Sequence, residues 1–90
     1  MAHGFNAEPI SVKLELVVPT RDDKTAQMII RSLSPDDINL PEQLKIRYLV
    51  SQGSLIISLH GNVDLFKLKG TVNDIFLSLK PILKIINRLL

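Results

Sequence analysis

The last third of this 90-residue chain carries the apolar pattern that most constrains its fold. From Val63 onward, large apolar side chains recur at steps of three and four positions, which is the spacing of one face of an α-helix. This seam consists of Leu65, Leu68, Val72, Ile75, Leu79, Ile82, Ile86 and Leu89. The pattern predicts a single helix over residues 63–90. Because amphipathic helices are stabilised mainly by tertiary packing, this one needs an apolar surface beneath it.

Three earlier segments supply such a surface, because their apolar residues fall at every second position, as in half-buried strands. These segments cover residues 10–18, 44–50 and 55–59. The last two are joined by the short stretch Ser51, Gln52 and Gly53. A tight connection that contains glycine predicts an antiparallel hairpin.

A shorter amphipathic helix is predicted over residues 22–33. Thr20 and the aspartates after it suit a capped start, and Pro35 disfavours helical geometry at Ser34. The predicted fold class is therefore α+β, a three-stranded antiparallel sheet with two helices packed on one face, in the chain order β-α-β-β-α. Because a helix separates the first two strands, the strand order is 1-3-2. We expect residues 1–9 to form a flexible tail and residues 10–90 a single domain.

The long helix is predicted to extend beyond the sheet. At roughly 1.5 Å per residue, a helix over residues 63–90 measures about 42 Å, whereas strands of seven or eight residues reach about 25 Å. A neighbouring chain would then have to cover the six apolar residues of the overhang. These are Ile82, Leu83, Ile85, Ile86, Leu89 and Leu90.

The sheet face without helices carries Val17, Leu49 and Ile56 among charged and polar side chains. Two interpretations stay open at this point. Either a partner sheet lies against this face, or these are the scattered apolar residues that any protein surface exposes.

The sequence contains no constellation of residues that indicates catalysis. His60 is the only histidine outside the N-terminal tail, and there is no cysteine. Helix-cap and turn positions account for Asp22, Asp23, Asp36 and Asp37. The glycines are isolated rather than grouped in a phosphate-binding loop. We therefore expect a protein that is not an enzyme and has no cofactor or metal site. The N-terminus lacks signal-peptide features and polar residues interrupt the last helix, so we expect a cytoplasmic protein without a membrane span.

Four short motifs resemble those of the CTAG/Pcc family, the small dimerisation subunit of the KEOPS complex. They are "LELVVP" before the first helix, "IIRSLSPDD" at its end, "SLIISL" in the hairpin and "LKGTVNDIFLSL" in the long helix. The likeness covers residues 11–90. In the last motif, Leu68, Lys69, Gly70 and Asn73 fall where the family has leucine, arginine, a small residue and asparagine.

The resemblance implies a non-catalytic scaffold that forms a homodimer, or a heterodimer with a Pcc-family paralogue. It also implies that the helices bind the ATPase-fold catalytic subunit of KEOPS, which transfers threonylcarbamoyl to an adenosine of certain tRNAs, and that the dimer helps to hold tRNA. Lys69 in place of the family's arginine, beside Gly70, favours a paralogue that caps the dimer. Carried over by position and extended along the apolar stripe, the expected partner interface is Met28, Arg31, Phe66, Asn73, Phe76, Leu77, Lys80, Leu83, Ile86 and Leu90.

A basic ridge is formed by Lys80, Lys84 and Arg88, which are spaced by four residues on the long helix. It either keeps an apolar helix in water or, together with Lys69, contacts RNA phosphates. Two further function classes stay open. One is an autonomous KH-like RNA-binding module, although the sequence lacks the GxxG loop of that fold. The other is an amphipathic helix that lies on a membrane surface.

Overall fold

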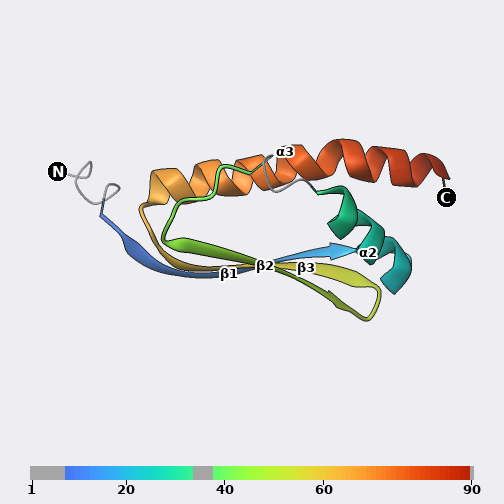
Figure 1. Ribbon diagram of the computed structural model, residues 1–90, viewed down its shortest axis with the longest axis horizontal. Coiled ribbons are helices and arrows are strands. Elements are labelled where there is room, and N and C mark those ends of the chain that lie inside the picture. The colour runs from blue at the N-terminus through green and yellow to red at the C-terminus, as the bar shows by residue number, and fades with distance from the viewer. Residues whose placement is uncertain (1–7, 34–37, 90) are drawn as a thin grey trace.

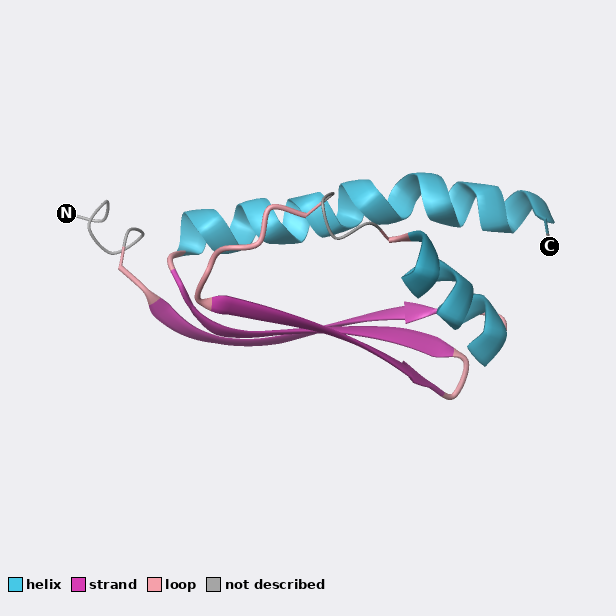
Figure 2. Cartoon of the chain, viewed as in Figure 1, coloured by secondary structure: helices cyan, strands magenta, loops and turns pink. Residues whose placement is uncertain are grey.

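The strands form a three-stranded antiparallel sheet in the order β1-β3-β2 (Figure 1). The computed structural model describes residues 8–33 and 38–89 of the chain. Figure 2 shows both helices on the same side of the sheet, so the predicted fold class is confirmed. The elements are β1 (Ile10–Pro19), α2 (Asp23–Ser32), β2 (Leu44–Ser51), β3 (Ser54–Val63) and α3 (Leu65–Leu89).

The core lies between the inner face of the sheet and the two helices. Every second residue of the central strand β3 points into it, and Leu55, Ile57 and Leu59 are fully buried there. Ile75 of α3 is also fully buried, as the predicted seam requires. Thr71 is a buried polar residue of the same helix face, and its hydroxyl donates a hydrogen bond to the Lys67 carbonyl at 2.9 Å.

The boundary between β3 and α3 differs from the prediction. Val63 belongs to β3, where it pairs with Ile10, and the helix begins at Leu65. Asp64 separates the two elements because its Oδ1 accepts a hydrogen bond from the Lys67 N–H at 2.9 Å and so caps the helix. With ten residues, β3 is about 33 Å long, and our estimate of the sheet length was too short.

The longer sheet and the position of α2 remove most of the predicted overhang. α3 has 25 residues and measures about 37 Å, only slightly more than β3. Beneath its C-terminal half lies α2, at the end of the sheet (Figure 1). Ile86 is only 7% exposed, and Ile82 and Leu83 pack against the core. The prediction that these three residues need a neighbouring chain is therefore wrong.

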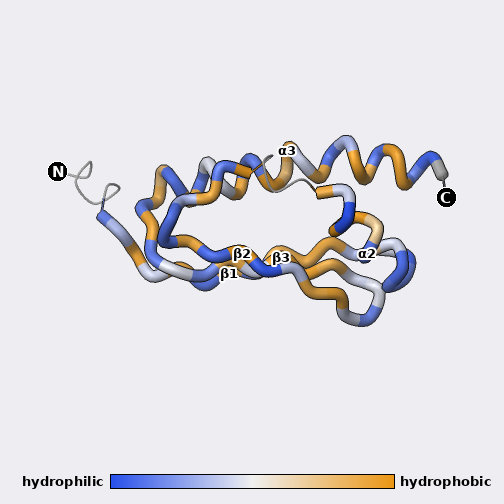
Figure 3. The backbone as a smooth tube through the Cα atoms, viewed as in Figure 1, coloured by the Kyte–Doolittle hydropathy of each residue, from blue (hydrophilic) through white to orange (hydrophobic). Residues whose placement is uncertain are grey.

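Two of the six overhang residues have side chains outside the described part of the chain, namely Leu89 and Leu90. Ile85, by contrast, is 59% exposed. Figure 3 shows hydrophobic and hydrophilic stretches alternating along α3 towards its C-terminal end, in keeping with a helix that is buried on one side.

The start of α2 is fixed to the hairpin turn by a set of polar contacts. Oδ1 of Asp22 accepts hydrogen bonds from both the N–H and the hydroxyl of Thr25 at 2.8 Å, so Asp22 is the N-cap. Asp23 Oδ1 accepts from the Gly53 N–H at 2.7 Å. The Thr20 hydroxyl lies within hydrogen-bond reach of the carbonyl oxygens of Asp22 and Gly53 and shares its one hydrogen between them, so Thr20 ties β1 to the turn and is not the cap.

Gly61 marks a place where two backbone segments touch, and replacing it with alanine tests this contact. Its φ is +141°, and a Cβ there would lie 2.1 Å from the carbonyl oxygen of Gln43. We expect Gly61→Ala to lower the free energy of unfolding by about 2–3 kcal/mol through backbone strain and overpacking. Urea denaturation measures the change. The matched control is Gly70→Ala, where the added Cβ meets no described atom within 4 Å beyond its chain neighbours and its own helix backbone, and a loss of equal size there would contradict the account.

The Asp22 cap also predicts a pH dependence of stability. The hydrogen bonds from Thr25 lower the pKa of Asp22 below its ordinary value of 3.8. The folded pKa thus lies below the unfolded one, so this stabilisation is present above about pH 4 and is lost as the pH falls through the folded pKa. Asp22→Asn keeps a capping side chain but no charge. We expect the difference in Tm between the native protein and this variant to shrink below about pH 4, and a constant difference would contradict the assignment.

Candidate interaction surfaces

The outer face of α3 exposes large apolar side chains that the core leaves uncovered. Phe66 is 65% exposed, Leu77 is 57% exposed and Phe76 is 51% exposed. On an α-helix Phe66 and Leu77 lie on the side opposite Ile75, which is fully buried, and Phe76 lies at the edge of the buried face. The chain thus leaves large apolar side chains of this helix exposed to solvent, and exposed apolar patches often mark interaction sites.

A shallow groove of about 560 Å³ runs between these aromatic rings. Gly70 lines it, and apart from its chain neighbours and the backbone of its own helix, no atom of the described residues lies within 4 Å of the position that a Cβ would take. The glycine is thus not required by the chain's own packing, and it leaves room for an approaching side chain or backbone. The groove is lined by Phe66, Lys69, Gly70, Val72, Asn73 and Phe76.

A second groove lies where α2 meets α3 and joins the outer surfaces of the two helices. Ser32 lines it from α2, and Leu77 and Pro81 line it from α3. Arg31 and Met28, which precede Ser32 in α2, are exposed to solvent. The structure therefore presents the outer sides of both helices as one uncovered region, but it does not bring Met28 or Arg31 into the groove at Gly70.

The predicted interface residues fall into three groups. Ile86 is buried within the core and offers no surface to a partner, whereas Leu83 is half-buried against the core and offers part of its side chain. Leu90 lies outside the described residues. The exposed members of the predicted interface are Met28, Arg31, Phe66, Asn73, Phe76, Leu77 and Lys80.

All four basic residues proposed for RNA contact are exposed along α3. Lys80, Lys84 and Arg88 follow one another at successive turns, and Lys69 lies at the apolar groove. Within residues 8–33 and 38–89, the one ion pair joins Lys67 Nζ to Asp64 Oδ2 at 3.8 Å. The ridge charges are therefore available to an anionic partner.

On the open face of the sheet, opposite the helices, the strand register places side chains of β1, β3 and β2 next to one another in rows across the strands. Val17 and Leu49 both pair with Ile56, and we call these three residues the apolar row. Lys13 and Lys45 both pair with His60, and these three form the basic row. Val17 is 59% exposed, and all three basic-row side chains are exposed.

The row between these two is formed by Glu15, Ser58 and Arg47. Glu15 and Arg47 are separated by the central strand, so about 10 Å lies between their backbones. Glu15 is the one acidic residue that the three rows contain. The open face is therefore apolar at one end, basic at the other and poor in carboxylates.

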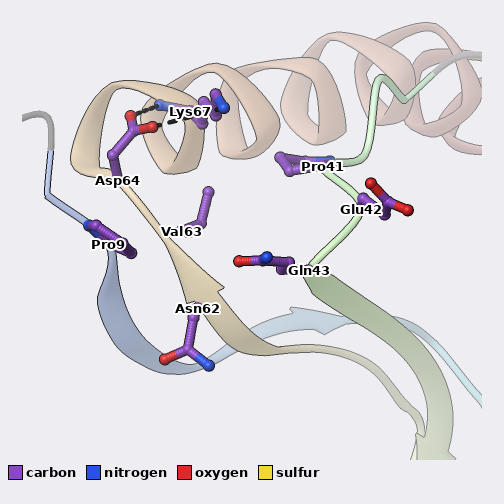
Figure 4. A pocket seen from close by; sticks show the side chains of 8 residues that line it. All are labelled: Pro9, Pro41, Glu42, Gln43, Asn62, Val63, Asp64 and Lys67. Atoms are coloured by element: carbon purple, nitrogen blue, oxygen red, sulfur yellow. Dashed lines mark hydrogen bonds and ion pairs between the residues drawn. The ribbon is translucent and has the colours of Figure 1, made fainter.

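A cavity of about 310 Å³ lies where β3 ends and α3 begins (Figure 4). Asn62 lines it from β3, Gln43 from the turn before β2, and Asp64 and Lys67 from the start of α3. The Asp64 carboxylate is already engaged in capping α3 and in the ion pair with Lys67, so its role there is structural.

The described residues offer little for catalysis. They contain no group of three or more histidine, cysteine, aspartate or glutamate side chains that could hold a metal ion. Burial raises the pKa of Tyr48 above its ordinary value of 10.0, so this phenol, which is already neutral at pH 7, is still harder to ionise. Neither helix in the described segments is long and apolar enough to cross a membrane.

Comparisons with known proteins agree with the family suggested by the sequence motifs. A family model described as transcription factor Pcc1 matches residues 13–87. A chain in the crystal structure of a binary complex Gon7–Pcc1 has a similar fold, with a TM-score of 0.75 and 25% sequence identity; the match covers 88% of this chain and 96% of that chain. A comparison with curated proteins finds no match. The chain therefore belongs to the Pcc1 family, the family of KEOPS subunits that its motifs resemble.

Proposed function

We propose that this chain is a non-catalytic scaffold subunit of the KEOPS complex, which makes the threonylcarbamoyl-adenosine modification of tRNA. The observation that carries the proposal is the uncovered apolar surface of α3 around Gly70. The catalytic step belongs to the ATPase-fold subunit. This chain contributes surfaces that hold other subunits in place.

The outer helix face is the proposed site for another KEOPS subunit. Burying a phenylalanine side chain contributes about 1.5–3 kcal/mol, so Phe66 and Phe76 together suffice to anchor an interface. Gly70 between them lets a partner backbone approach α3 closely. The basic ridge beyond Leu77 would then contact acidic groups of that partner or of bound tRNA.

The open sheet face is the proposed site for a second Pcc-family chain or a chain that takes its place. This assignment is supported by the apolar row, which has no partner within the described residues. It is also supported by the Gon7–Pcc1 structure, in which the matched chain belongs to a complex of two different proteins. One face would thus serve dimerisation and the other would serve the remaining subunits.

The double variant Phe66→Asp/Phe76→Asp tests the helix surface. Both side chains are more than half exposed, so we expect the variant to fold with a Tm within a few degrees of the native value. Charges in the groove would be buried unpaired in the complex, so we expect at least a tenfold loss of affinity for the other KEOPS subunits, on the order of 1.4 kcal/mol or more. Co-purification after co-expression, followed by calorimetry, measures this loss.

The control for this experiment is Ile85→Asp. Ile85 is similarly exposed on the same helix but lies away from the groove lining. The control should keep native binding. If the double variant folds and still co-purifies like the native chain, the helix surface is not the binding site.

The exposed basic ridge favours a second candidate role, contact with tRNA. The triple variant Lys80→Ala/Lys84→Ala/Arg88→Ala removes three charges without touching the core. If the ridge contacts phosphates, tRNA affinity of the assembled complex should fall and its dependence on log[salt] should become shallower by up to about 2–3. Filter binding at several salt concentrations gives both values. An unchanged slope would assign the ridge to solubility or to protein contacts.

A further inference from the structure

Strand β2 forms one edge of the sheet, and its outer side has free backbone groups within residues 8–33 and 38–89. The strand order β1-β3-β2 gives β2 a single neighbouring strand. Outside the ladder with β3, the one backbone hydrogen bond of β2 in these residues runs from the Leu44 N–H to the Pro41 carbonyl at 3.0 Å. The N–H and C=O groups that point away from β3 are therefore open to an added strand.

An apolar pocket of about 190 Å³ lies beside the inner side of this edge. Ile46 and Tyr48 line it from β2, Leu33 lines it from the end of α2, and Ile38 and Leu40 line it from the loop before β2. Among the described residues, none from β1, β3 or α3 lines the pocket, so it lies at the β2 side of the core. Leu40, Ile46 and Tyr48 are only half-buried, and the core thus leaves apolar groups uncovered along this edge.

The other face of the same strand carries positive charge. Lys45 and Arg47 alternate along β2 with Ile46 and Tyr48, so their side chains point to the opposite face of the sheet. Both are exposed, and in the described part of the chain neither has a carboxylate within salt-bridge distance. The β2 edge therefore presents apolar side chains on one face and two cations on the other.

From these three features we infer that the β2 edge is a docking site for an extended segment of another protein in which acidic and apolar residues alternate. The free backbone groups select an extended chain, because a strand can bond to them one after another. Apolar side chains of the segment would enter the pocket, and its carboxylates would lie about 5 Å from Lys45 and Arg47 across the strands. The pocket and the backbone edge lie outside both surfaces of the proposed function, and the two cations border the open face.

The opposite edge of the sheet, formed by β1, fits such a segment less well. Pro9 precedes β1 and Pro19 ends it, and proline has no N–H to donate to an added strand. Lys13 and Glu15 are successive residues on the open face of β1. An acidic segment would gain from the lysine there and lose from the glutamate.

A second copy of this chain is a poorer occupant of the β2 edge than an acidic segment. β2 contains no aspartate or glutamate, so pairing two β2 edges in any register leaves Lys45 and Arg47 without a carboxylate opposite. Pairing β1 of one copy with β2 of the next is a head-to-tail contact, which builds open-ended assemblies. The features of this edge therefore favour a segment of a different protein.

A capped eight-residue peptide of alternating glutamate and valine is the probe for this site. We expect the native chain to bind it at low salt, with NMR shift changes concentrated on the amides of Leu44–Ser51. A lysine–valine peptide should bind at least tenfold more weakly because it repels Lys45 and Arg47. A glutamate–serine peptide should lose at least as much because it leaves the pocket unfilled. Titrations followed by two-dimensional ¹H–¹⁵N spectra give the dissociation constants and the position of the bound peptide.

N-methylated peptides distinguish strand addition from contact through side chains alone. The N–H groups of alternate residues in an extended segment point to opposite sides, so only one set can bond to β2. Methyl groups are placed on the glutamate nitrogens of one peptide and on the valine nitrogens of another. One of these peptides should lose binding and the other should keep it. Equal behaviour of the two would overturn the inference.

The variant Lys45→Glu/Arg47→Glu tests the charges of the edge. Both side chains are exposed, so we expect it to fold, and circular dichroism melts check this. Its preference should reverse, so that the lysine–valine peptide binds more tightly than the glutamate–valine peptide. The matched control Lys13→Glu/Lys24→Glu makes the same change of net charge outside β2 and should keep the native preference.

Two further results would overturn the inference. One is an absence of binding by the glutamate–valine peptide at millimolar concentration, and the other is a set of shift changes confined to β1 or α3. Since these experiments contain no KEOPS subunit, their failure leaves the Phe66→Asp/Phe76→Asp test of the proposed function unaffected.

Discussion

The burial of one face of α3 on the inner side of the sheet is the interaction on which the rest of the structure depends. A 90-residue chain buries a limited share of its surface, so it can complete only one core. That core uses the inner sheet face, the inner face of α3 and the apolar side of α2. In the described residues, the outer face of α3 and the opposite face of the sheet are not covered by the chain itself.

One core with two uncovered surfaces would allow so small a protein to act as a scaffold between two partners. Both uncovered surfaces lie on elements that are rigidly held by the same core. The extents of the molecule are 50 × 22 × 20 Å, so the helix layer and the sheet are each presented along its length. A partner on one surface therefore does not compete with a partner on the other.

The periodic parts of the fold could be predicted from the sequence because each has one buried and one exposed side. The seam of α3 and the alternation in β1 and β2 are of this kind. The end of β3 could not be predicted in the same way. Gly61 and Asn62 interrupt the apolar alternation there, and Gly61 is present because the Gln43 backbone passes too close for a side chain. The strand length, and with it the supposed overhang of Ile86, was misjudged for this reason.

The candidate surfaces were predicted only in part. Exposed aromatic residues on the helix were identified by position, but the burial of Ile38, which lies in the loop before β2, was not predicted. An isolated apolar residue among polar ones gives no periodic signal. Gly70 had no explanation in the sequence, because its significance depends on the two rings that flank it in space.

Hydroxyl-radical footprinting of the chain, free and within the assembled KEOPS complex, tests the central claim most directly. The method reports the solvent accessibility of individual aromatic and aliphatic side chains. Our account predicts that Phe66, Phe76 and Leu49 are modified readily in the free chain and are protected on assembly, while Ile85 stays reactive. Equal reactivity of Phe66 and Phe76 in both states would contradict it.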